Sequence, residues 1–154
     1  MSGGDSGDSG EGNDARGDEG KSRATASEFG MVMREAHYPG RAPVDTYGNG
    51  GFRFAEMSHR GSILCLPSGI YGWSAEQPAD LTAANFKRVL SEEGLELLLV
   101  GTGKDLVPLP AKLRQALMDK GIRCDPMSTG AAARTFNVLL GEGRAVGAAL
   151  LAVD

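Results

Sequence analysis

Two short segments of the chain contain residue types that bind anions in many proteins. These residues are Gly101, Thr102, Gly103 and Lys104 in the first segment and Ser128, Thr129 and Arg134 in the second. Ser128 is placed to begin a helix, and free N–H groups at a helix N-terminus together with the helix dipole attract negative charge. The sequence therefore predicts a small anion pocket built from both segments. Helix capping and a tight turn at the exit of a strand explain the same residues without a ligand.

The glycine pair of the first segment also matches the start of a dinucleotide-binding fingerprint. Asp125 lies 24 residues beyond Gly101, near the place of a ribose-binding acid. The third glycine of the fingerprint is absent, because that position is Leu106, and Pro108 and Pro110 delay the helix that should begin at the loop. The glycine spacing of a phosphate-binding loop is missing as well. We therefore predict no cofactor.

The residues that usually perform catalysis or hold metals do not form a recognisable set. His37 and His59 are the only two histidines, and neither has a metal-ligand partner at usable spacing. Cys65 and Cys124 both fall in predicted strands, where a cysteine acts as a small buried apolar residue. No Gly-x-Ser-x-Gly motif occurs, and the acidic residues are scattered. The sequence thus predicts no metal site and no catalytic residue, which favours a protein that is not an enzyme and leaves an enzyme with an unrecognised site as the alternative.

Trp73 is the only tryptophan of the chain. Burial of such a ring stabilises a fold by about 2–3 kcal/mol, which favours core packing. A lone aromatic side chain on a surface can instead be the anchor for a protein partner. Both interpretations of Trp73 remain open at this point.

Charge divides the chain into two parts. Residues 1–40 contain eight of the 20 acidic residues and four of the 16 basic ones, so the remainder is balanced. The Gly/Ser-rich acidic stretch 1–41 has too few large apolar residues to fold and is predicted to be a disordered lead-in to one domain, residues 42–154. A balanced domain lacks the positive field that nucleic-acid binding needs. The chain also lacks a signal-like start and an apolar run of about 18–20 residues, which predicts a cytoplasmic protein without a membrane span.

The elements that position these residues follow from the hydrophobic pattern. Five of the six residues 95–100 are apolar without alternation, which predicts a central strand covered on both faces. Glycine-rich turns, among them Asn49-Gly50, divide residues 44–73 into short pieces typical of β-hairpins. Thr82, Pro110 and Ser128 are placed to begin helices, with Gly94 and Gly121 at the ends of the first two. With strands at 122–124 and 144–153, the C-terminal half reads β-α-β-α-β, a parallel layer in an α/β fold.

Several motifs, taken in order, resemble a family of small uncharacterised α/β domains found in bacteria, archaea and mitochondria. Its best-known member is an assembly factor of the mitochondrial NADH:ubiquinone oxidoreductase (complex I). The resemblance covers about residues 44–152. The motifs are Tyr47-Gly48, Gly51-Phe52, Gly61-Ser62, Leu66-Pro67, Trp73, Val100-Gly101-Thr102-Gly103, Thr135-Phe136-Asn137, Glu142-Gly143-Arg144 and Ala148-Ala149-Leu150.

This resemblance implies a three-layer α/β domain with a central mixed sheet, and no established catalytic residue or cofactor. It favours a non-enzymatic accessory or interaction protein, and the lack of a transit-like N-terminus predicts that this one is bacterial and cytoplasmic. Such a protein would bind subunits of a membrane (respiratory) complex through the loops at the carboxyl ends of the central strands. The alternatives are a small-molecule or anion-binding domain or an enzyme that uses the same loops, and a rigid oligomerisation module.

Overall fold

The computed structural model describes residues 36–154, whose strands form a six-stranded and a three-stranded β-sheet. The chain divides into two units, residues 1–37 and 38–154, and strand β3 (Ala36–Tyr38) crosses their boundary. The second unit carries all the other described elements. Most of the predicted disordered lead-in, residues 1–35, lies outside the described residues.

The second unit alternates strands and helices in its C-terminal half. Its strands are β4 (Val44–Gly48), β5 (Gly51–Phe54), β6 (Met57–Arg60), β7 (Ser62–Leu66), β8 (Gly69–Trp73), β9 (Leu97–Gly101), β10 (Arg123–Met127) and β11 (Val146–Leu150). Its helices are the 3-10 segments η1 (Pro78–Asp80) and η2 (Ala83–Phe86) and the α-helices α2 (Lys87–Leu90), α3 (Ala111–Asp119) and α4 (Thr129–Gly141).

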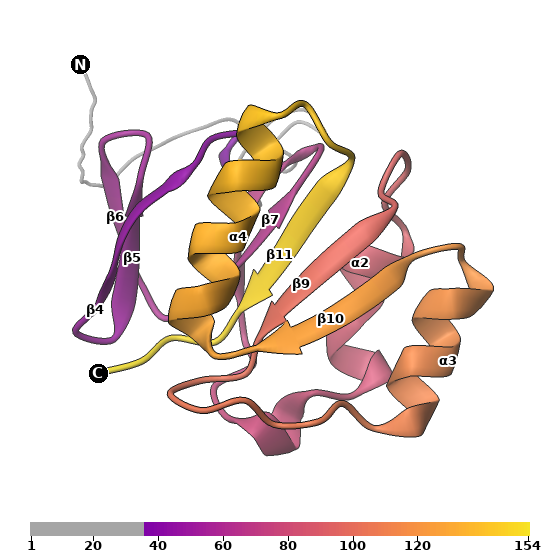
Figure 1. Cartoon of the computed structure of the whole chain (residues 1–154). Coiled ribbons are helices and arrows are strands. Elements are labelled where there is room, and N and C mark those ends of the chain that lie inside the picture. Colours follow the sequence, from indigo (N-terminus) through magenta and orange to yellow (C-terminus); the bar gives the residue numbers. More distant parts are fainter. Residues whose placement is uncertain (1–35) are drawn as a thin grey trace, which may run out of the picture. The chain divides into compact units, whose positions relative to one another are not determined.

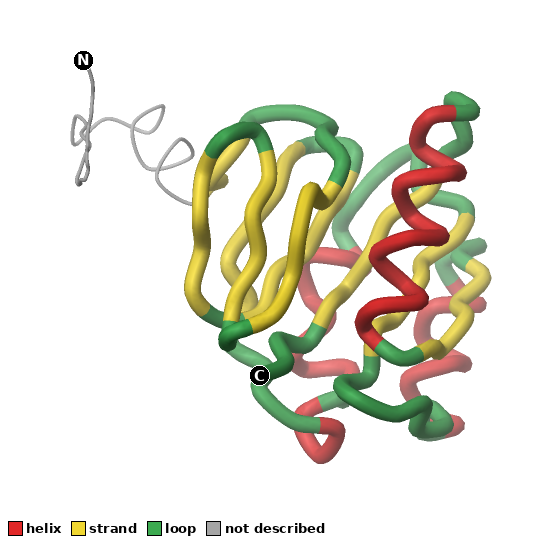
Figure 2. The backbone as a smooth tube through the Cα atoms, turned by 60° about the vertical axis from the view of Figure 1, so that its left-hand side comes forward, coloured by secondary structure: helices red, strands yellow, loops and turns green. Residues whose placement is uncertain are grey.

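Strand β9 lies inside the larger sheet, between β10 and β11, and is parallel to both (Figure 1). The sheet continues from β11 to β7 and β8, which pair antiparallel. Leu99 packs in one core cluster with Ala132 and Phe136 of α4. Leu98 and Val100, also buried, point to the opposite face because side chains alternate along a strand. Helices cover the sheet on both sides (Figure 2), so the predicted covered strand and the three-layer α/β fold with a mixed sheet are confirmed.

The β-hairpin half divides between the two sheets. Strands β4, β5 and β6 form a separate antiparallel sheet, whereas β7 and β8 extend the larger one. The predicted turn at Asn49 and Gly50 is confirmed, since both residues have positive φ (54° and 78°) as a two-residue hairpin turn requires. A second turn of this kind follows β5, at Ala55 and Glu56 (φ 48° and 64°). It carries no glycine or asparagine, and the sequence therefore gave no signal for it.

The first predicted helix is shorter than expected. It consists of η2 and α2, and Thr82 has the extended backbone of an N-cap but no capping hydrogen bond from its side chain. Gly94 was expected at its C-terminus, and this prediction is wrong. The helix ends at Leu90, with Ser91 as the C-cap, and Gly94 lies in the loop beyond. A helical segment this short is held by the burial of Phe86 rather than by its own hydrogen bonds.

The other two helices begin where predicted. Pro110 is the N-cap of α3, and Gly121 follows its C-cap with a φ of 77°. The Ser128 hydroxyl accepts a hydrogen bond from the N–H of Ala131 at the start of α4. Strand β10 runs to Met127, three residues further than predicted. It can include a proline because it lies at the edge of its sheet, where one missing donor is tolerated.

Asn137 attaches strand β4 to helix α4. Its Oδ1 accepts from the backbone N–H of Val44 and its Nδ2 donates to the Val44 carbonyl, both over 2.8 Å. The amide group thus pairs with Val44 as a neighbouring strand would. No hydrophobic contact could satisfy both backbone groups at this place.

We expect Asn137→Ala to lower the free energy of unfolding by about 2 kcal/mol, because it leaves two partly buried backbone groups without partners. Urea denaturation followed by circular dichroism measures this change. Val138→Ala is the matched control, since Val138 is exposed on the same helix and its truncation should cost under about 0.5 kcal/mol. Equal stability of the two variants would contradict the role of Asn137.

Candidate functional site

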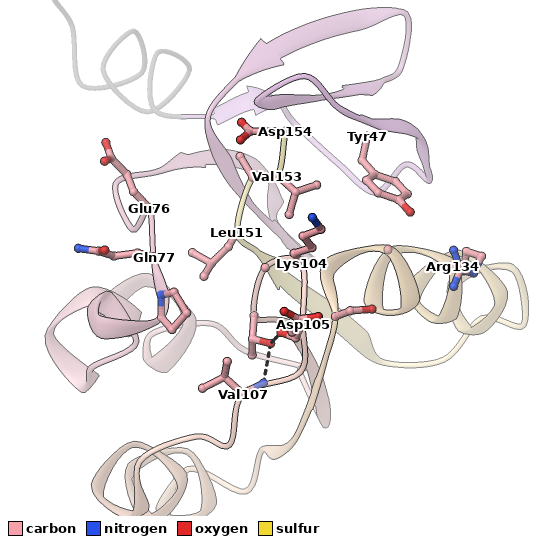
Figure 3. Close-up of a pocket in the computed structure, with 16 residues that line it drawn as sticks. Tyr47, Glu76, Gln77, Lys104, Asp105, Val107, Arg134, Leu151, Val153 and Asp154 are labelled. Atoms are coloured by element: carbon pink, nitrogen blue, oxygen red, sulfur yellow. Dashed lines mark hydrogen bonds between the residues drawn. The ribbon is translucent and has the colours of Figure 1, made fainter.

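The two predicted segments meet at one cleft of about 720 Å³ (Figure 3). The first follows β9 and the second follows β10, and parallel neighbouring strands end at the same edge of a sheet. The chain after β11 and parts of the hairpin half complete the walls. The lining residues are Tyr47, Glu76, Gln77, Pro78, Thr102, Gly103, Lys104, Asp105, Val107, Ser128, Gly130, Arg134, Leu151, Ala152, Val153 and Asp154.

Two of the predicted binding residues lie behind the cleft wall. Gly101 and Thr129 are buried and do not line the cleft. A Cβ atom at position 101 would approach the Thr129 Cα atom and the Leu150 side chain to 2.9 Å. Glycine at this position is therefore explained by close packing rather than by a ligand.

The Thr129 side chain connects three segments of the chain. Its hydroxyl donates to the carbonyl of Leu151 over 2.7 Å and accepts from the N–H of Gly103 over 3.1 Å. The Thr129 N–H in turn donates to the Gly103 carbonyl over 2.8 Å. The start of α4, the exit of β9 and the exit of β11 are thus joined at one buried residue.

Thr102 fixes the loop that follows β9. Its buried hydroxyl donates to the Asp105 carbonyl over 2.6 Å, lies 3.1 Å from the Met127 carbonyl, and accepts from the Val107 N–H over 3.0 Å. A hydroxyl with these partners has little capacity left for a ligand. Thr102 therefore shapes the cleft, although it lies in its wall.

The N-terminus of α4 offers fewer free donors than expected. The N–H groups of Thr129, Ala131 and Ala132 donate to Gly103 and to the side chain and carbonyl of Ser128. The Tyr47 hydroxyl lies directly against Gly130, because a Cβ atom at position 130 would overlap it. The expectation of free N–H groups is wrong for these three residues, and an anion here would depend on side-chain cations.

The charged side chains of the lining are of both signs. Lys104 and Arg134 are exposed cations, and Glu76, Asp105 and Asp154 are exposed acids. In Figure 3, Glu76 lies at one end of the cleft and Arg134 at the other. An acid in the loop after a buried strand, such as Asp105, could have been noted from the sequence, whereas nothing local marks Glu76.

Trp73 lies outside the cleft lining and is half-buried. Its indole N–H donates to the carbonyl of Asn85 over 2.7 Å, and its ring meets Phe86 edge-on with centroids 5.2 Å apart. These contacts give the tryptophan a packing role. A further role as a partner anchor stays a prediction.

Neither cysteine is an activated nucleophile. Burial raises the pKa of the Cys65 thiol to about 12 and also raises the pKa of Cys124, so both remain protonated at neutral pH. Among residues 36–154, no three His, Cys, Asp or Glu side chains gather to hold a metal ion. The helices of this same region are too short or too polar to cross a membrane.

We expect Thr129→Val, which keeps the shape of the side chain, to destabilise the protein by about 1–3 kcal/mol, because the Leu151 carbonyl and the Gly103 N–H lose a buried partner. Thr129→Ser retains the hydroxyl and should lose only about 1 kcal/mol for the missing methyl group. Urea denaturation compares the two. A valine variant as stable as the wild type would show that this hydroxyl does not hold the cleft together.

Comparison with known proteins finds relatives over nearly all of the second unit. A family model described as "Protein of unknown function (DUF498/DUF598)" matches residues 44–151. A crystal structure described as an outer membrane protein from Bartonella henselae is 60% identical with a TM-score of 0.74, and covers 77% of this chain and 100% of that one. A solution structure from Rhodopseudomonas palustris is 42% identical with a TM-score of 0.69, covering 85% and 93%.

Two kinds of curated relative match as well. An uncharacterised protein of Rhodobacter capsulatus is 44% identical over 79% of this chain and 93% of its own length. The NADH dehydrogenase [ubiquinone] 1 alpha subcomplex assembly factor 3 is 30% identical in mouse, over 79% of this chain, and 33% identical in human, over 70%. The match spans 66% of the mouse protein and 59% of the human one.

Proposed function

The chain belongs to the DUF498/DUF598 family, as its motifs indicated, and we propose that it is a non-enzymatic accessory protein for the assembly of a membrane respiratory complex. The observation that carries this proposal is the identity of 30–33% to proteins named as assembly factors of NADH dehydrogenase. The role stated in that name belongs to those longer proteins. Its extension to this chain, and to a cytoplasmic bacterial setting, is our proposal.

The surface around the cleft supports the binding of a protein partner. Tyr47, which lines the cleft, is 42% exposed, and Leu106, between the lining residues Asp105 and Val107, is 59% exposed. Large apolar side chains that project beside a concave surface are typical anchors of protein interfaces. Trp73 is a further candidate anchor through the exposed part of its ring.

We expect cells that lack this protein to contain less assembled NADH:quinone oxidoreductase, and a plasmid copy to restore it. Leu106→Asp should restore less than the wild type, because a charge replaces an apolar anchor. Blue native electrophoresis and NADH oxidation by isolated membranes measure the complex. Met118→Asp is the matched control, since Met118 is similarly exposed but lies on α3, outside the loop whose residues Asp105 and Val107 line the cleft.

A normal content of the complex in the deletion strain would overturn the proposed role. If Leu106→Asp restores the complex fully, the proposed role still holds, but Leu106 is not an anchor for the partner. Both outcomes depend on the protein level, which immunoblotting of the same cells controls.

The cleft itself favours a second candidate function, the binding of a small anionic molecule. Its volume of about 720 Å³ lies within the usual range of ligand pockets, roughly 300–1,000 Å³. Lys104 and Arg134 supply cations from two different segments. An enzyme that uses these loops would also have to bind its substrate in this cleft first. If the protein is instead an oligomerisation module, its apparent molecular mass in solution should rise with protein concentration.

We expect a bound phosphate, nucleotide or carboxylate at 100 times its Kd to stabilise the protein by about 2.7 kcal/mol. Thermal unfolding with each compound measures this, and Arg134→Ala should abolish the response because it removes one of the two cations. Lys112→Ala is the control, since Lys112 is exposed on α3 and outside the lining. A response of wild-type size in Arg134→Ala would exclude this pocket.

A further inference from the structure

The charges of the cleft suit a ligand that carries both signs. A free anion that reached Lys104 and Arg134 would also meet the carboxylates of Glu76, Asp105 and Asp154. A free cation would meet the two basic side chains. Because unlike charges attract and like charges repel, a lining of mixed sign complements a ligand that carries both charges better than it complements a simple ion.

The charges are also separated along the cleft. Figure 3 shows Glu76 at one end and Arg134 at the opposite end, with Leu151 and Val153 between them. Leu151 is buried and Val153 half-buried, so both provide apolar contact area in the wall. The cleft thus presents an acid at one end and a base at the other. Between them lie the apolar side chains of Leu151 and Val153 together with the charged side chains of Lys104, Asp105 and Asp154.

An extended polypeptide can match such an order. In a strand, alternate side chains point to the same face. Residues i, i+2 and i+4 of a bound strand can therefore contact the two ends and the middle of the cleft. The exposed side chains of Tyr47 and Leu106 beside the cleft extend the surface for a chain that enters and leaves it.

We infer that the cleft binds an extended segment of a partner protein with a basic residue at the Glu76 end, an apolar residue over Leu151 and Val153, and an acidic residue at the Arg134 end. This inference rests on the proposed role in so far as it requires a protein partner. It adds the chemistry by which that partner is recognised.

The test is selection from a random heptapeptide phage library on the immobilised full chain. The wild type should enrich peptides with basic, apolar and acidic residues at alternate positions. Arg134→Glu should exchange the selected acidic residue for a basic one, and Glu76→Lys should exchange the basic residue for an acidic one. Lys112→Glu and Glu96→Lys, exposed charges outside the lining, should select the wild-type pattern.

Fluorescence polarisation then measures the selected peptides. A wild-type peptide should bind about tenfold more weakly to Arg134→Glu, equal to about 1.4 kcal/mol, and a peptide with the matching charge exchanged should recover the affinity. Both substituted side chains are exposed, and circular dichroism of each variant verifies that it is folded.

Three outcomes would overturn the inference. They are no enrichment on the wild type, the same enrichment on both charge-reversed variants, and stabilisation by inorganic phosphate without any peptide binding. Each of these outcomes can occur while the deletion strain still lacks the assembled complex. The phage selection therefore tests how the partner is recognised, and the deletion strain separately tests the proposed role.

Discussion

The buried hydroxyl group of Thr129 is the contact on which the geometry of the cleft depends. It joins the exits of β9 and β11 to the first turn of α4, and all three segments contribute to the walls. The close approach of Gly101 to this threonine leaves no space for a side chain at position 101. Gly101 and Thr129, residue types that bind ligands in other proteins, therefore have a structural role here. The exposed charges of the cleft belong to other residues, namely Glu76, Lys104, Asp105, Arg134 and Asp154. A buried hydroxyl with both partners in place has one favourable arrangement, which fixes these loops relative to one another.

The sequence predicted those parts of the fold that depend on local signals. The uninterrupted apolar stretch of β9, the Asn49-Gly50 turn, Pro110 before α3 and Ser128 at the start of α4 each have a direct physical cause. Residues 44–73 were predicted to form β-hairpins, but the bounds of β4 and β6 were not. Three of the five residues of β4 and two of the four residues of β6 are exposed, and the backbone pairing with β5 defines both strands. Asn137 and Val44, which form two hydrogen bonds with each other, are 93 residues apart in the chain, and no local sequence pattern predicts this contact.

The candidate site was predictable only in part, for a related reason. Two strand exits that carry glycine, threonine and serine can be expected to meet, since parallel strands end at the same edge of the sheet. The opposite wall comes from Tyr47 before a hairpin turn, Glu76 after β8 and the residues beyond β11. These segments reach the cleft through tertiary contacts such as the hydrogen bond from the Gly50 N–H to the Val153 carbonyl. Their charges, which change the expected anion pocket into a cleft of mixed sign, therefore became visible only with the fold.

Buried contacts at Gly101 and Thr129 hold the cleft together, whereas the charged side chains that line it are exposed. This arrangement has a consequence for the strength of binding. Exposed charge pairs each contribute roughly 0–1 kcal/mol in water, so they select among partners and accelerate encounter more than they hold a complex together. A partner recognised mainly by Glu76, Lys104 and Arg134 would dissociate readily, and salt would weaken its binding. If the exposed side chains of Tyr47 and Leu106 contact the partner, they would add affinity without a large buried interface. Weak and reversible binding of this kind would be compatible with the proposed accessory role, whereas a permanent subunit interface is usually larger and more apolar.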